Sequence, residues 1–227
     1  MSLLRTLCLL SALLTAFAGA ASPPPRAEDK AGWHLETDKD GIRVYSRFLP
    51  NSRLKEIRVH CEMPGTLSQL VALYSDVDNY PQVISRTRTA RLLRRPSETE
   101  LYYYLETDMP PPVADRDLVM HLQFAYDAGQ QVLVMNTTAA NGLVAPQAGL
   151  VRIPYWSGKW QVRPVGSNRL QIDYTFLVDP GGELPAWLVN MVAPVAPYQS
   201  FVQLRDALQL PRYQGRSFSF ISPAARR

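Results

Sequence analysis

The sequence predicts an α+β domain in which a curved antiparallel sheet of about eight strands is closed by a C-terminal helix. Segments that alternate apolar and polar residues run through most of the chain, and turn residues separate them. Only two segments have helical character, one near residue 70 and one at residues 183–210. A single sheet of this size needs its apolar face covered, and the C-terminal segment is long enough to cover it.

The candidate strands follow one another with short connections. The first two form a hairpin, and the connections between the others are rich in proline, glycine, asparagine and serine, which suit turns. The expected strands are residues 42–49, 53–63, 87–94, 100–107, 117–126, 131–139, 151–162 and 169–178.

Two helical segments complete the expected domain. We expect Thr66 to be the N-cap of a short amphipathic helix that ends near Asp76, because apolar residues follow Thr66 at helical spacing. The C-terminal segment is apolar with few charges, but it contains Pro194 and Pro197. An interior proline removes a backbone hydrogen bond and clashes with the preceding turn. We therefore expect two helical pieces that meet at residues 193–197.

The N-terminal residues have the layout of a secretory signal peptide. Arg5 precedes an apolar run at residues 6–18, and small residues follow at 18–20. The run has about 13 residues, whereas a helix needs roughly 20 to cross a bilayer. We expect a signal peptide at residues 1–20 and export to the periplasm or the exterior. The other expected parts are a flexible leader at 21–32, a single folded domain at 33–210 and a basic, disordered tail at 211–227.

Composition excludes some function classes. The formal net charge is +4, which is mild for 227 residues, so nucleic acid is not an expected partner. The chain has two cysteines, and cleavage would leave only Cys61, which we interpret as a small buried residue. The cations that cluster at Arg86, Arg88, Arg91, Arg94 and Arg95 form either a solvated strand face or a surface that attracts anionic headgroups.

Arg116 is the candidate site residue that strand phase identifies. Leu118, Met120, Leu122, Phe124 and Tyr126 share one face of their strand, and Arg116 is in phase with them. A guanidinium that points into an apolar interior needs a partner. Either the strand turns and the cation reaches solvent, or an acid holds it, for which Glu100, Glu106 and Asp108 are the candidates. Asp115 and Asp117 are interpreted as local ion-pairing residues.

Five short motifs stand in a characteristic order, and each is weak alone. They are Trp33 with Asp40-Gly41-Ile42-Arg43-Val44-Tyr45, Asp76-Val77-Asp78-Asn79-Tyr80-Pro81, Asp115-Arg116-Asp117-Leu118-Val119, Gly158-Lys159-Trp160, and Tyr174 before Asp179-Pro180-Gly181-Gly182-Glu183-Leu184-Pro185-Ala186-Trp187-Leu188-Val189-Asn190. Together they make residues 33–210 resemble the START (steroidogenic-acute-regulatory-related lipid-transfer) domains, in particular their bacterial exported members. The resemblance implies a helix-grip fold with a lipid or sterol-like ligand between sheet and C-terminal helix, and a gate made by that helix and a nearby loop. The proline pair in the gate helix departs from the family pattern.

Strand phase and family position together predict the ligand contacts. The predicted residues are Arg116, Met120, Phe124, Tyr103, Trp160, Met191 and Tyr198. We expect a monomeric carrier that exchanges an apolar small molecule, a lipid or a sterol-like compound, during transient contact with a membrane surface. No cofactor and no metal is expected, because His34, His60 and His121 are scattered without metal-binding spacing.

Three alternatives to a carrier remain open. One is an aromatase/cyclase-like enzyme on the same fold, although no catalytic motif was found in the sequence. Another is a noncatalytic interaction protein with an exposed apolar patch. The third is a fully packed core, in which the sheet and the helices leave no pocket for a ligand.

Overall fold

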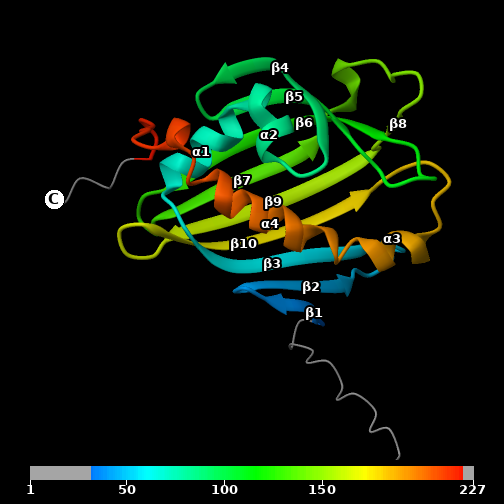
Figure 1. Cartoon of the computed structure of the whole chain (residues 1–227), viewed down its shortest axis with the longest axis horizontal. Helices are drawn as coiled ribbons and strands as arrows, with labels where there is room; N and C mark the ends of the chain where they lie inside the picture. The colour runs from blue at the N-terminus through cyan, green and yellow to red at the C-terminus, as the bar shows by residue number, and fades with distance from the viewer. Residues whose placement is uncertain (1–31, 222–227) are drawn as a thin grey trace, which may run out of the picture.

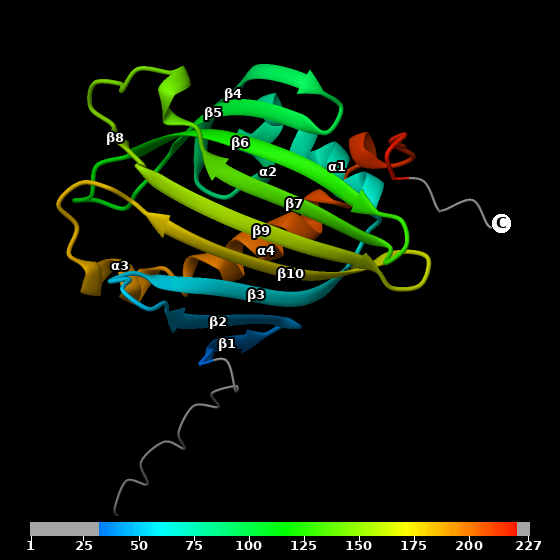
Figure 2. The ribbon, with the colours of Figure 1, turned by 180° about the vertical axis from the view of Figure 1, so that it is seen from behind.

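The computed structural model describes residues 32–221, which form one large sheet with helices on one side (Figures 1 and 2). The sheet has ten strands in the order β1-β2-β3-β10-β9-β7-β6-β5-β4, and β8 lies beside β6. The first five strands are β1 (His34–Lys39), β2 (Ile42–Phe48), β3 (Lys55–Pro64), β4 (Thr87–Ser97) and β5 (Glu100–Thr107). The other five are β6 (Arg116–Asp127), β7 (Val132–Ala139), β8 (Val151–Arg152), β9 (Tyr155–Pro164) and β10 (Arg169–Asp179).

The predicted α+β class and helix-grip arrangement are confirmed, with two differences in the strands. The strand β1 was not predicted, because its six residues are mostly polar and lie at the sheet edge, where alternation is weak. The strand expected at residues 151–162 is divided in two. Pro154 lacks a backbone N–H, so pairing is interrupted there. As a result, β8 runs parallel to the start of β6, whereas β9 pairs with β7 and β10.

The helices lie where the sequence predicts them, with additional short turns. The first helix, α1 (Leu67–Ser75), begins at the predicted N-cap: the Thr66 hydroxyl accepts from the Gln69 N–H, and the Gln69 side chain accepts from the Thr66 N–H. After α1 come η1 (Val77–Asn79) and α2 (Tyr80–Val83), and η2 (Asn141–Leu143) follows β7. The predicted break is confirmed, because α3 (Ala186–Val192) ends before α4 (Ala196–Ala207) begins.

The core lies between the concave face of the sheet and the helices. Figure 1 shows α4 crossing the sheet diagonally, with α1 and α2 beside it and α3 beyond its N-terminal end. Cys61 is buried in this core as predicted, and burial raises the pKa of its thiol to about 12. Figure 2 shows α1, α2 and α4 behind the sheet, so these helices leave its other face, which we call the outer face, uncovered.

The chain beyond α4 also packs against the domain. It forms η3 (Pro211–Tyr213), and the side chains of Phe218, Phe220 and Ile221 then pack against the core. The first part of the tail expected at 211–227 is therefore ordered, up to Ile221. The expected signal peptide, almost all of the leader, and residues 222–227 lie outside the described residues. Within residues 32–221, no helix is both long and apolar enough to cross a membrane.

Candidate ligand site

Four of the predicted contact residues come together in the interior. Met120 and Phe124 on β6, Tyr103 on β5 and Trp160 on β9 are each 4–5% exposed and belong to one apolar cluster. They face the helices because alternate residues of a strand point to the same side of a sheet. The strand phase predicted for β6 is thus correct.

Aromatic rings fill the space between the sheet and α4. Trp160 stacks on Tyr174 of β10 with ring centroids 4.1 Å apart, and it also contacts Phe201 of α4 at 5.4 Å and Tyr74 of α1 at 5.4 Å. Burial raises the pKa of the Tyr174 phenol well above its ordinary value, so the phenol stays protonated. Trp160, Tyr174 and Phe201 are 5%, 7% and 3% exposed, so the rings form a buried part of the core.

Arg116 points inward, but the structure contradicts its predicted acidic partners. Its side chain is buried, with 3% exposure, and its guanidinium donates to the backbone carbonyl oxygens of Pro180 at 3.2 Å, Gly181 at 3.3 Å and Ala114. Two of these partners, Pro180 and Gly181, belong to the loop that leads from β10 into α3, and the third, Ala114, lies just before β6. Burial lowers the pKa of Arg116 below its usual range, although nearby Asp115 acts in the opposite direction. Arg116 therefore connects the loop that precedes α3 to the first residue of β6.

Asp115 and Asp117, on either side of Arg116, differ in burial and in their ion-pair partners, which strand phase alone does not predict. Asp115 makes the expected local ion pair, with Arg88 at the surface. Asp117 is fully buried, and both of its oxygens accept from Arg152 on β8, at 2.7 and 2.8 Å. Asp117 is thus an ion-pairing residue as predicted, but its pair is buried and not local, because β8 and the segment before it return to cover this side of β6.

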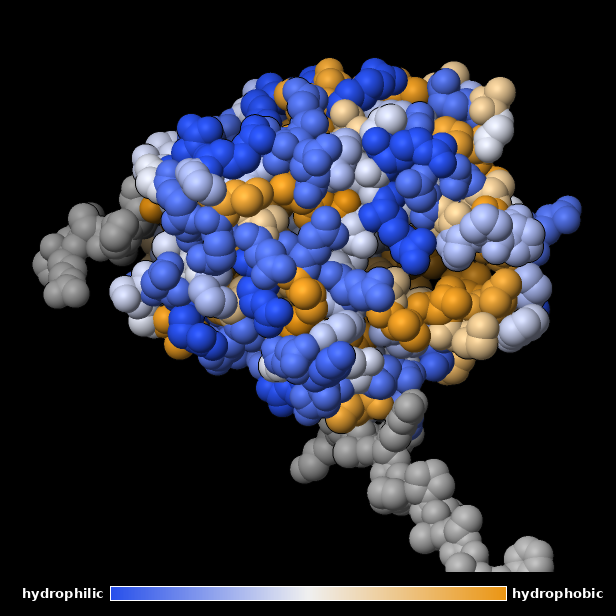
Figure 3. Space-filling view, in the orientation of Figure 1, coloured by the Kyte–Doolittle hydropathy of each residue, from blue (hydrophilic) through white to orange (hydrophobic). Residues whose placement is uncertain are grey.

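Helix α3 presents apolar side chains to solvent. Trp187, Met191, Val192 and Val195 are 68%, 59%, 49% and 64% exposed, and we call these four residues the α3 patch. Figure 3 shows it as an apolar area at one end of the molecule. The predicted placement of Met191 in the interior was wrong, because a helix of seven residues with few packing partners can present either side inward.

Polar contacts hold α3 and the start of α4 against the sheet edge. The Asn190 side chain accepts from the Lys55 N–H at 2.9 Å and donates to the Arg53 carbonyl at 3.0 Å, which fastens α3 to the beginning of β3. Tyr198 is only half-buried, and its hydroxyl donates to Asp40 in the turn between β1 and β2. Tyr198 therefore lies at the edge of the interior and not inside it. No sequence pattern identified Asn190 as a contact residue of α3.

The three histidines lie apart. On the outer face, His60 Nδ1 is 3.0 Å from Asp173, while His121 Nε2 is 2.8 Å from Glu100 and its ring stacks on Tyr102. His34 begins β1. In the part of the chain that the structure describes, no three residues of metal-binding type form a cluster.

Comparison with known proteins agrees with this arrangement. The family model for polyketide cyclase/dehydrase and lipid transport matches residues 63–199, more than half of the chain. The uncharacterized protein PA1579 of Pseudomonas aeruginosa is 28% identical over 206 residues, which cover 91% of this chain and 99% of that protein. Human phosphatidylcholine transfer protein is 24% identical over 168 residues, which cover 72% of this chain and 77% of that protein.

Solved structures show the same fold. The STAR-related lipid transfer protein from Xanthomonas axonopodis matches with a TM-score of 0.74 and 29% identity, over 79% of this chain and 99% of that one. Human STARD10 matches with a TM-score of 0.70 and 19% identity, over 80% and 74% of the two chains, and shows the fold alone.

Proposed function

The chain belongs to the polyketide cyclase/dehydrase and lipid transport family and to its START-domain members, and we propose that it carries a polar-headed lipid. The ligand would lie between the sheet and α4, among the aromatic side chains of Trp160, Tyr174 and Phe201. The names of two relatives, a phosphatidylcholine transfer protein and a STAR-related lipid transfer protein, support a lipid as the ligand class.

The observation that carries this proposal is the way α3 is held. A few contacts fix the position of this short helix. Carbonyl groups of the loop before it accept hydrogen bonds from Arg116, and Asn190 within it is hydrogen-bonded to the edge of β3. Prolines separate α3 from α4, so the two helices are not one continuous rod. Hydrogen bonds of this kind contribute about 1 kcal/mol each, so a membrane surface that takes up the α3 patch can release the helix. Opening at α3 would admit a lipid chain to the interior and bring the Arg116 guanidinium within reach of its headgroup.

The test is lipid transfer between donor and acceptor vesicles, together with organic extraction of the purified protein. We expect extraction to yield lipid, and we expect the double variant Trp187→Ser, Met191→Ser to slow transfer of a fluorescent phosphatidylcholine at least fivefold. Leu143→Ser is the matched control, because Leu143 is 49% exposed on η2, outside the α3 patch. If extraction yields no lipid and the wild-type protein transfers none, the carrier proposal is wrong.

We further propose that the carrier acts outside the cytoplasm, on the sequence pattern of residues 1–20. The mass of the mature N-terminus tests this part: a protein that begins near Ala21 supports export, and one that retains residues 1–20 contradicts it.

A further inference from the structure

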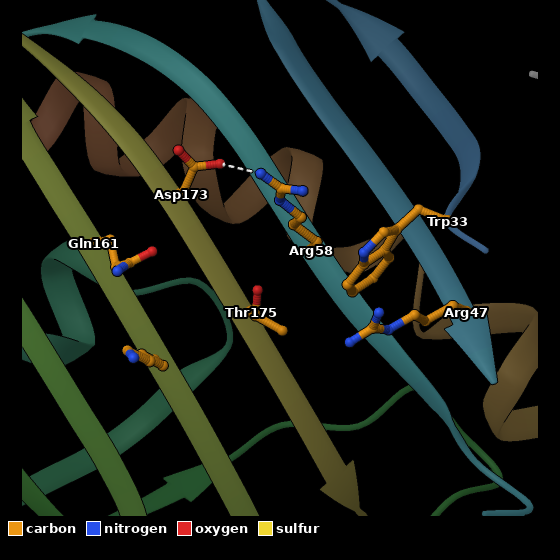
Figure 4. Close-up of a pocket in the computed structure, with 7 residues that line it drawn as sticks. Trp33, Arg47, Arg58, Gln161, Asp173 and Thr175 are labelled. Atoms are coloured by element: carbon orange, nitrogen blue, oxygen red, sulfur yellow. Dashed lines mark hydrogen bonds and ion pairs between the residues drawn. The ribbon is translucent and has the colours of Figure 1, made fainter. Parts of the chain in front are cut away.

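The outer face of the sheet has two hollows, which share Lys159 and Thr175 in their walls. One has a volume of about 230 Å³ and is also lined by Trp33, Arg47, Arg58, Gln161 and Asp173 (Figure 4). The other has about 330 Å³ and extends to the apolar side chains of Leu49, Tyr155 and Leu177. A charged hollow therefore continues into a more apolar one.

The strand register places a short side chain, Thr175, between two long ones where the two hollows meet. Arg58 on β3 pairs with Thr175 on β10, and Thr175 pairs with Lys159 on β9, so the three residues form one row across the outer face. Neighbouring strands are about 4.8 Å apart, which puts the two cations on either side of a short hydroxyl side chain, with Cα atoms roughly 10 Å apart. Two long flexible side chains can close over a small group that rests on Thr175.

The positive charge in the hollow is only partly neutralised. Arg58 donates to a single oxygen of Asp173 at 2.8 Å, and His60 shares that same oxygen. Lys159 makes no ion pair within residues 32–221. Arg47 forms the far wall, where its guanidinium lies 4.2 Å from the centre of the Trp33 ring and pairs with Glu56 at 2.7 Å. Figure 4 shows Arg58 directed toward Asp173, with the side chain of Thr175 on the neighbouring strand.

We propose that this outer-face site binds a phosphate group between Arg58 and Lys159, over the hydroxyl of Thr175. A guanidinium, an ammonium, a hydroxyl and the Gln161 amide supply donors from several directions, which suits a tetrahedral group with three terminal oxygens better than a planar carboxylate. The organic part of the ligand extends over Leu49, Tyr155 and Leu177. The source of the phosphate is either a soluble phosphate ester or a phospholipid headgroup.

This site is independent of the proposed lipid cavity. Residues 173, 175 and 177 of β10 face outward, whereas Ile172, Tyr174 and Phe176 face the core. A ligand bound at the outer-face site therefore occupies the opposite side of the sheet from the interior. Loss of phosphate binding with normal lipid transfer would separate the two proposals.

Calorimetric titration with inorganic phosphate and with hexyl phosphate tests the site. We expect hexyl phosphate to bind at least tenfold more tightly than inorganic phosphate, because its chain reaches the apolar hollow. Lys159→Gln should weaken hexyl phosphate binding at least tenfold, and Thr175→Val severalfold. Arg91→Gln removes the same charge from β4, which lies outside the hollow, and should change binding less than twofold.

Flotation with vesicles distinguishes the two sources. Vesicles of phosphatidylcholine with one-fifth phosphatidic acid should recruit wild-type protein more than Lys159→Gln if the phosphate belongs to a lipid, and both proteins equally if it belongs to a soluble ester. The site proposal is overturned if neither soluble phosphate nor these vesicles bind, or if Lys159→Gln behaves like Arg91→Gln throughout.

Discussion

Arg116 shows how a buried cation can be held without a carboxylate. Its three acceptors are backbone carbonyls, and two of them belong to Pro180 and Gly181 at the end of β10. Carbonyl dipoles stabilise a guanidinium less than a buried carboxylate would, but they cost less to desolvate. None of these three acceptors carries a formal charge.

Replacing Arg116 by Met is expected to lower the free energy of unfolding by about 1–3 kcal/mol, because buried acceptors lose their donor. Urea denaturation measures the change, provided that the slope of the transition stays constant. Arg88→Met is the control: Arg88 lies at the surface with acidic partners, and its replacement should have a smaller effect. An Arg116→Met protein within about 0.5 kcal/mol of wild type would mean that the carbonyl contacts contribute nothing.

At the scale of elements, the loop between β10 and α3 depends on a glycine. Gly181 has φ +67°, and a Cβ there would lie 2.7 Å from the Arg152 carbonyl oxygen and 2.9 Å from Pro154 Cδ. Any larger residue must displace the loop, and with it a carbonyl that binds Arg116. The loop conformation and the position of α3 are therefore coupled.

Gly181→Ala should destabilise the protein by more than Gly166→Ala, which is a closely matched control. Gly166 has φ +64° and nothing within 4 Å of its Cβ position, so its replacement costs only the backbone penalty of about 1–2 kcal/mol. Gly181→Ala adds a steric clash, and hydrogen exchange should show faster opening at α3. Equal effects of the two substitutions would show that the loop adapts without disturbing its neighbours.

The elements were more predictable from the sequence than the contacts between them. Alternation and turn residues located most strands, and the prolines located the break between α3 and α4, because these signals are local. Two of the three partners of Arg116 lie 64 and 65 residues away along the chain, in a loop whose carbonyls have no sequence signature. Burial of Asp117 likewise depends on the return of β8, and the outward side of α3 depends on tertiary packing.

At the scale of the whole molecule, different kinds of contact close the two ends of the space between the sheet and the helices. Figure 1 shows α3 at one end and the C-terminal segment at the other. At the C-terminal end, Tyr213 is 2% exposed, and its hydroxyl accepts from Asn79 at 2.9 Å and donates to Asp76 at 3.0 Å. Phe220 packs nearby against Phe124, with ring centroids 6.1 Å apart. That end is built from buried contacts, whereas α3 is exposed and lightly held.

Because the ends differ, variants at each should affect different properties. Tyr213→Phe removes a hydroxyl with two partners and should lower the free energy of unfolding by about 0.5–1.5 kcal/mol per hydrogen bond, while vesicle-to-vesicle lipid transfer stays within twofold of wild type. Asn190→Ala removes the contacts of α3 with Arg53 and Lys55, and should change the transfer rate more than threefold with a smaller effect on global unfolding, because the exposed α3 opens locally before the domain unfolds. Urea denaturation and fluorescent lipid transfer measure the two properties on the same preparations. If Tyr213→Phe alters transfer as much as Asn190→Ala does, the lipid does not enter specifically at α3, and the assignment of this helix as the gate fails.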